Sequence, residues 1–125
     1  MKILFIEDAL DGHHIPYLNG LTSCRNFESV VIIPEYSEKI NATQIVYSNL
    51  RFPTKSVWDY WKWICFIAKE TWKNKYDVVH FLDGDTIMRF FGLGFAMLRV
   101  PKVLITYHGF YEGILRAMSY RLMCM

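Results

Sequence analysis

The sequence has no large excess of charge, no paired cysteine motif and no long apolar run. Lys and Arg number 14 against 12 Asp and Glu, so the net charge is +2, too balanced for a protein that binds mainly through phosphate contacts. The three cysteines, Cys24, Cys65 and Cys124, show no C-x-x-C spacing, which argues against a disulfide scaffold and a thiolate zinc site. The apolar segments fall short of the roughly 20 residues that a membrane-spanning helix needs.

Two further motifs are absent. Only Lys2 precedes the apolar residues 3–6, and Glu7 and Asp8 follow at once, which is not the pattern of a secretory signal peptide. The G-x-G-x-x-G fingerprint of dinucleotide-binding folds does not occur, so nothing indicates NAD or FAD as a cofactor. We therefore expect a cytoplasmic protein without a metal or a bound cofactor.

The composition predicts a chain that folds. Hydrophobic residues make up 53% and charged residues 21% of the 125 positions, whereas disordered chains have low hydrophobicity and high net charge. The length fits one compact domain, residues 1–125, and excludes two.

Short apolar runs alternate along the chain with segments of helical period. Continuous apolar strands of this kind are typical of a parallel sheet that is covered on both faces. The sequence therefore predicts a doubly wound, Rossmann-like α/β domain with a mostly parallel five-stranded sheet in the order 3-2-1-4-5. The predicted strands are residues 3–6, 30–33, 45–47, 78–82 and 102–107. The predicted helices begin near residues 14, 56, 86 and 111 and end near 26, 74, 99 and 125.

Ligands of such sheets bind beyond the carboxyl ends of the strands. The loop after the first strand contains Gly12, His13 and His14. A glycine before a helix lets backbone amides approach an anion, which the helix dipole also favours. An ordinary tight turn with a histidine cap explains the same residues equally well.

The helix predicted from residue 56 is rich in tryptophan and lysine, from Trp58 to Trp72. Such a helix either covers a sheet with its aromatic side chains while the lysines stay in water, or lies peripherally on a membrane surface. Phe66 falls within the predicted polar stripe, and we expect it to be exposed. Ser56 and Asn74 are the expected caps at the two ends.

Four segments together resemble the N-terminal domain of GT-B fold glycosyltransferases, and glycosyltransferase family 4 in particular, whose members retain anomeric configuration. Their order and their placement at strand ends match this family over most of the chain. The segments are Met1–Ile6, Gly12–Leu18, Tyr76–His80 and Val103–Gly109.

The resemblance implies the acceptor-binding half of an enzyme that transfers a sugar from a nucleotide-sugar to a saccharide or lipid-linked acceptor. By position, His108 is the catalytic candidate that contacts the transferred sugar. The residues expected to bind donor or acceptor are Gly12, His13, His14, Asp83, Thr106 and Gly109. The donor-binding domain of the family has no counterpart in these 125 residues, so we expect a truncated domain that is inactive without a C-terminal domain or second chain.

Three alternatives remain beside this resemblance. Asp83 and Asp85 flank a glycine after an apolar strand, as in metal-dependent GT-A transferases, although an ordinary turn that caps the next helix has the same pattern. A non-catalytic remnant or interaction module would account for a chain with no donor domain. A phosphoryl-accepting receiver domain fits the length but fails in its chemistry, because no aspartate follows the third strand. His80 lies inside a predicted strand, where we expect a structural role.

Overall fold

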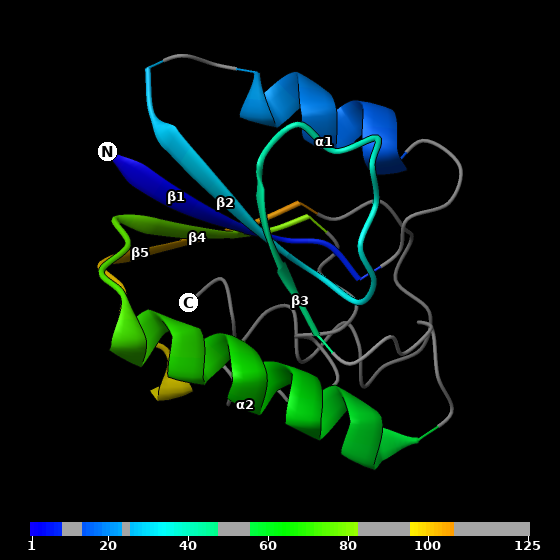
Figure 1. Cartoon of the computed structure of the whole chain (residues 1–125). Helices are drawn as coiled ribbons and strands as arrows, with labels where there is room; N and C mark the ends of the chain where they lie inside the picture. The colour runs from blue at the N-terminus through cyan, green and yellow to red at the C-terminus, as the bar shows by residue number, and fades with distance from the viewer. Residues whose placement is uncertain (9–13, 24–25, 48–55, 83–95, 107–125) are drawn as a thin grey trace.

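The computed structural model describes residues 1–8, 14–23, 26–47, 56–82 and 96–106. This part of the chain contains five strands and two helices, with α1 between β1 and β2 and α2 between β3 and β4 (Figure 1). The elements are β1 (Lys2–Ile6), α1 (His14–Thr22), β2 (Glu28–Ile33), β3 (Thr43–Val46), α2 (Val57–Lys73), β4 (Val78–Phe81) and β5 (Lys102–Ile105).

The five strands form one sheet in the order β3-β2-β1-β4-β5. All four neighbouring pairs are parallel, which confirms the predicted α/β class and strand order. Phe5 in the central strand stands opposite Val31 on one side and His80 on the other. The central position of β1 explains its apolar sequence, since all its residues from Ile3 to Ile6 are buried.

The two helices cover opposite faces of the sheet (Figure 1). Side chains of β1 alternate between these faces: Leu4 and Ile6 join a core cluster with Trp63 of α2, whereas Ile3 and Phe5 join a cluster with Leu18 of α1. The described domain therefore has three layers with two separate apolar cores.

Helix α1 is shorter than predicted and ends at Thr22 instead of residue 26. The Ser23 backbone N–H donates to the Asn19 carbonyl, and its hydroxyl donates to the Gly20 carbonyl over 2.9 Å. The first bond is a normal i→i−4 bond of the helix, whereas the second occupies a carbonyl that a longer helix would use. The chain must also leave the helix in time to start β2, where the Glu28 N–H bonds to the Met1 carbonyl.

Helix α2 begins and ends as expected, between Ser56 and Asn74. The Ser56 side chain makes no capping hydrogen bond, whereas the Asn74 N–H donates to the Glu70 carbonyl over 3.0 Å. None of the helices in the described segments is long and apolar enough to cross a bilayer.

Phe66 of α2 corrects one prediction, because it is half-buried instead of exposed. Its ring lies 5.0 Å from that of Tyr47, which follows β3, and it packs against the core between α2 and the sheet. The end of β3 thus widens the buried side of the helix beyond what its own periodicity indicates.

The predicted helix at residues 86–99 is described only at its end. Residues 96 and 97 are helical and residues 98–100 are not. Residues 83–95 and the predicted helix at 111–125 lie outside the described residues.

Candidate functional site

The carboxyl ends of the strands end in line. The residues that directly follow β1, β4 and β5 are Glu7, Leu82 and Thr106. Each donates its backbone N–H group to the neighbouring strand, over 2.9 to 3.1 Å. The Tyr47 N–H does the same beside β2, over 2.8 Å. The backbone hydrogen bonds between neighbouring strands therefore continue one residue beyond the strands, to the edge where ligands of parallel sheets bind.

A side-chain hydrogen bond joins two neighbouring strands at this edge. His80 Nε2 lies 2.8 Å from Thr106 Oγ1. His80 stands opposite Leu104 in the register between β4 and β5, so Thr106, two residues further along, projects from the same face of the sheet. The parallel register thus brings together one residue from each of the segments Tyr76–His80 and Val103–Gly109.

Burial lowers the pKa of His80 below its ordinary value of 6.5, because a partly desolvated imidazole loses more in its charged form than in its neutral form. One side of the ring faces Phe5, at 5.6 Å between ring centroids. At pH 7 the imidazole is therefore neutral, and its tautomer determines whether Nε2 donates to Thr106 or accepts from it. In either case the Thr106 hydroxyl retains hydrogen-bonding capacity for a second partner.

Glu7 brings a carboxyl group to the same edge. It is fully buried, and Glu7 and Thr71 are the buried polar residues of the described segments. Alternation along β1 places the Glu7 side chain on the face of the sheet that carries Phe5 and His80. This face of the carboxyl edge thus combines a buried carboxyl group with a half-buried imidazole and hydroxyl. The imidazole and the hydroxyl are groups that hydrogen-bond polyhydroxylated ligands.

Two of the residues predicted for the site lie in the described segments. Thr106 is at the carboxyl edge, and His14 is the first residue of α1. The remaining predicted residues lie outside the described segments; they are Gly12, His13, Asp83, Asp85, His108 and Gly109. His80, expected from the sequence to be structural, is the additional candidate that the strand register brings to Thr106.

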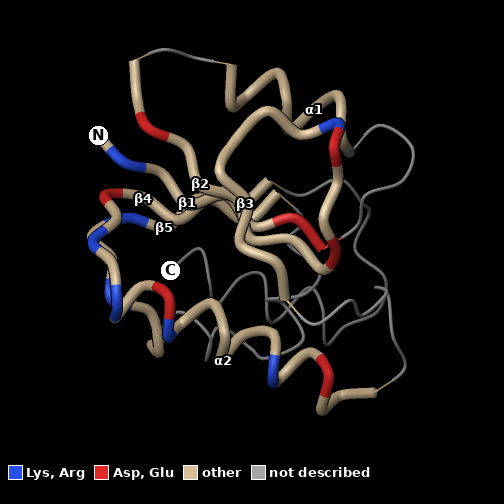
Figure 2. Tube along the Cα trace, in the orientation of Figure 1, with Lys and Arg blue, Asp and Glu red and all other residues tan. Residues whose placement is uncertain are grey.

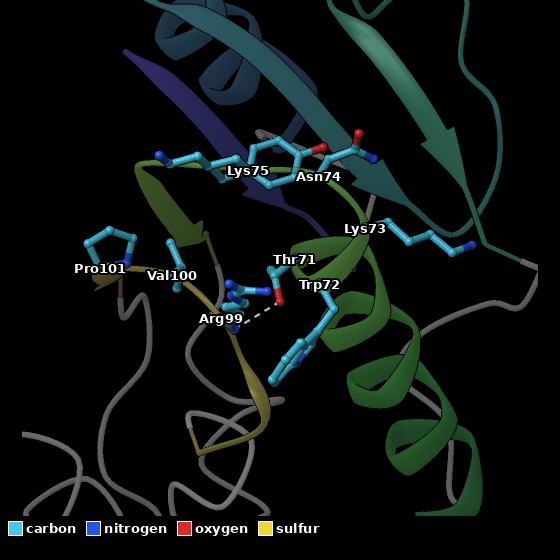
Figure 3. Close-up of a pocket in the computed structure, with 9 residues that line it drawn as sticks. Thr71, Trp72, Lys73, Asn74, Lys75, Arg99, Val100 and Pro101 are labelled. Carbon is cyan, nitrogen blue, oxygen red and sulfur yellow. Dashed lines mark hydrogen bonds between the residues drawn. The ribbon is translucent and has the colours of Figure 1, made fainter.

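A cavity of about 570 Å³ lies at the opposite, amino end of the sheet (Figure 3). The end of α2, with the residues that follow it, forms one wall, and residues 99–101 before β5 form the other. Its lining residues include Thr71, Trp72, Lys75 and Arg99. The two walls of this cavity are far apart along the chain, so no local pattern of the sequence indicates it.

Arg99 connects the two walls of this cavity. Its backbone N–H donates to Thr71 Oγ1 over 3.0 Å, the dashed bond in Figure 3. Its guanidinium lies over the Trp72 indole, 5.2 Å from the ring centroid, in a cation–π contact. The indole Nε1–H donates to the Met97 carbonyl over 2.9 Å. Trp72 is therefore held in place although 62% of its surface is exposed.

Tyr76 lines the same cavity and is a weaker acid than usual. Burial, and secondly the hydrogen bond of 2.7 Å that its hydroxyl donates to Glu70 Oε1, raise the pKa of the phenol. The hydroxyl therefore stays protonated at physiological pH and remains a donor to Glu70.

The described residues include no group of three or more His, Cys, Asp or Glu side chains that could hold a metal ion. No protein-family model, no curated protein and no solved structure matches the sequence.

Proposed function

We propose that this chain is the acceptor-side domain of a GT-B type glycosyltransferase, which holds a saccharide or lipid-linked acceptor and the sugar of a nucleotide-sugar donor at the carboxyl edge of its sheet. The observation that carries this proposal is the hydrogen bond between His80 and Thr106. It joins two of the four segments on which the family resemblance rests, at the edge where that family binds its substrates.

The fold supports the same reading. Three of the four segments overlap β1, β4 and β5, which are adjacent in the sheet. Residues as far apart in the numbering as Ile3 and Val78 are therefore paired in one continuous sheet. A neutral imidazole and a hydroxyl are suited to sugar hydroxyls, because both groups can donate or accept a hydrogen bond without carrying charge. Catalysis itself is assigned to His108, and donor binding requires a second domain or chain.

Nuclear magnetic resonance of the isotope-labelled 125-residue chain tests the proposal. Short oligosaccharides and a panel of nucleotide-sugars are titrated separately, and the His80 ring nitrogens and the Thr106 amide are followed. We expect saturable shifts at both residues. Thr106→Val should weaken binding about 5- to 15-fold, the worth of one hydrogen bond of about 1–1.5 kcal/mol.

Thr71→Val is the matched control, because it makes the same chemical change at the other end of the sheet, and it should leave sugar binding unchanged. A second assay supplies a family donor-binding domain in trans and follows transfer of labelled sugar, which His108→Ala should abolish. If neither saccharides nor nucleotide-sugars move the His80 and Thr106 signals, the proposal is wrong and the interaction-module alternative stands.

A further inference from the structure

The solvent face of α2 carries a regular row of side chains. Positions 58, 62, 65, 69 and 72 follow one another at spacings of four, three, four and three residues, which places them on one side of a helix. The residues of this row, here called the α2 stripe, are Trp58, Lys62, Cys65, Lys69 and Trp72.

The α2 stripe lies opposite the side of the helix that is buried on the sheet, which includes Trp63 and Ile67. Trp58 and Trp72 are 71% and 62% exposed, and Lys62 and Lys69 are exposed between them. At 1.5 Å per residue the two tryptophans are about 21 Å apart along the axis. An apolar anchor therefore stands near each end of the helix with cations between.

The charge on this side of the helix has one sign. The two carboxylates of α2, Asp59 and Glu70, are not in the α2 stripe, and Glu70 accepts hydrogen bonds from Tyr76 and Asn74. Arg99 adds a cation over Trp72 at one end. Figure 2 shows further blue segments along α2 and at the amino ends of β1 and β5.

From this arrangement we propose that the α2 stripe binds the surface of an anionic lipid bilayer, with α2 lying in the plane of the surface. Tryptophan rings partition into the headgroup boundary, while lysine side chains reach the lipid phosphates. The indole N–H of Trp72 already has a carbonyl partner, so this ring can enter the boundary without leaving an unpaired donor.

A second copy of the chain is a poorer occupant. In a two-fold symmetric dimer, identical surfaces meet, so the lysines of one α2 stripe would face those of the other, which is unfavourable. An anionic bilayer supplies the complementary charge instead. Membrane binding through the α2 stripe goes beyond the proposed sugar transfer and does not depend on it.

Flotation with lipid vesicles tests the proposal on the full 125-residue chain. Vesicles of phosphatidylcholine with about one third phosphatidylglycerol should carry the chain upward, and those of phosphatidylcholine alone should not. Binding should decrease at about 0.5 M salt, where screening is strong, and tryptophan fluorescence should shift to the blue on binding. Each cation near the surface contributes about fivefold in affinity, so Lys62→Glu/Lys69→Glu should weaken binding by about 25-fold or more.

Trp58→Ala/Trp72→Ala should reduce binding to the anionic vesicles and remove most of the fluorescence shift. Two controls change similar exposed residues elsewhere: Lys39→Glu reverses a charge and Tyr36→Ala removes an aromatic ring, and both should bind like the wild type. Circular dichroism of each variant establishes that it is folded.

Three outcomes would overturn the proposal. The chain could fail to float with anionic vesicles, or the stripe variants could bind as well as the two controls. Light scattering could instead reveal a dimer that Trp58→Ala/Trp72→Ala dissociates and that does not bind vesicles, in which case the α2 stripe is a self-association surface.

Discussion

Protonation of His80 should destabilise the fold. Burial lowers the pKa of His80 in the folded chain below 6.5, whereas the unfolded chain titrates near that ordinary value. As the pH falls through 6.5, the unfolded state therefore binds this proton first. The contribution of neutral His80 to the free energy of unfolding is complete above pH 6.5. It is lost as the pH falls from 6.5 toward the pKa of His80 in the folded chain, and it changes no further below that pKa.

The structure bounds the size of this effect. One group that binds a proton only in the unfolded state changes the free energy of unfolding by at most about 1.4 kcal/mol per pH unit. The contribution of His80 should be smaller than this limit, because its ring is only half-buried and water screens part of its charge. Protonation also removes the Nε2 lone pair, so the tautomer that accepts from Thr106 loses its bond.

Urea unfolding of the wild type and of His80→Gln, measured at intervals from about pH 5 to pH 8, isolates this contribution from that of the carboxylates. Glutamine keeps an amide near Thr106 but does not titrate. We expect the wild type to lose more stability than the variant as the pH falls through 6.5. Parallel curves for the two proteins would refute the assignment of a depressed pKa to His80.

Two further predictions concern stability. Trp63 is fully buried and meets the Tyr47 ring edge-on, at 5.3 Å between ring centroids. Trp63→Ala should therefore lower the free energy of unfolding by about 3–5 kcal/mol, whereas Trp58→Ala, at an exposed position, should lower it by about 0.5 kcal/mol or less. Equal losses of stability for the two variants in urea unfolding would contradict this prediction. The Asn19 side chain donates to the Lys39 carbonyl over 2.6 Å and accepts from the Asn41 N–H. Asn19→Ala should therefore lower the free energy of unfolding by about 1–2 kcal/mol and speed amide exchange at residues 37–41. Unchanged exchange at these residues would contradict this prediction.

The strands could be predicted because each is a local feature. Segments such as 3–6 and 30–33 are apolar without interruption, which only a strand covered on both faces requires. Helices separate β1 from β2 and β3 from β4, which favours parallel connections, and a short list of rules then favours the observed order. Nothing in these arguments depends on which residue of one strand faces which residue of the next.

The candidate site depends on the strand register, which could not be predicted from the sequence. His80 and Thr106 lie on strands that were predicted as neighbours, yet their hydrogen bond requires Phe81 to stand opposite Ile105. A shift by one residue would move one of the two side chains to the other face. The sequence therefore predicted at which edge of the sheet the site lies, but not which side chains contact each other there.

Helix α2 shows the same division. Its period alone placed Phe66 in water, but Phe66 packs on Tyr47. Periodicity identifies an apolar stripe, whereas the strand beneath the helix determines how wide the buried surface is. That strand comes from another part of the chain.

By itself, the sequence determined the fold class and the strands, because these follow from local hydrophobic patterns, and the strand order was an expectation from that fold class which the structure confirms. Only the tertiary structure decided the strand register, the His80–Thr106 pair, the buried width of α2 and the cavity beside Arg99. Each of these depends on distances between residues that are remote along the chain, and such distances are set when both cores pack together.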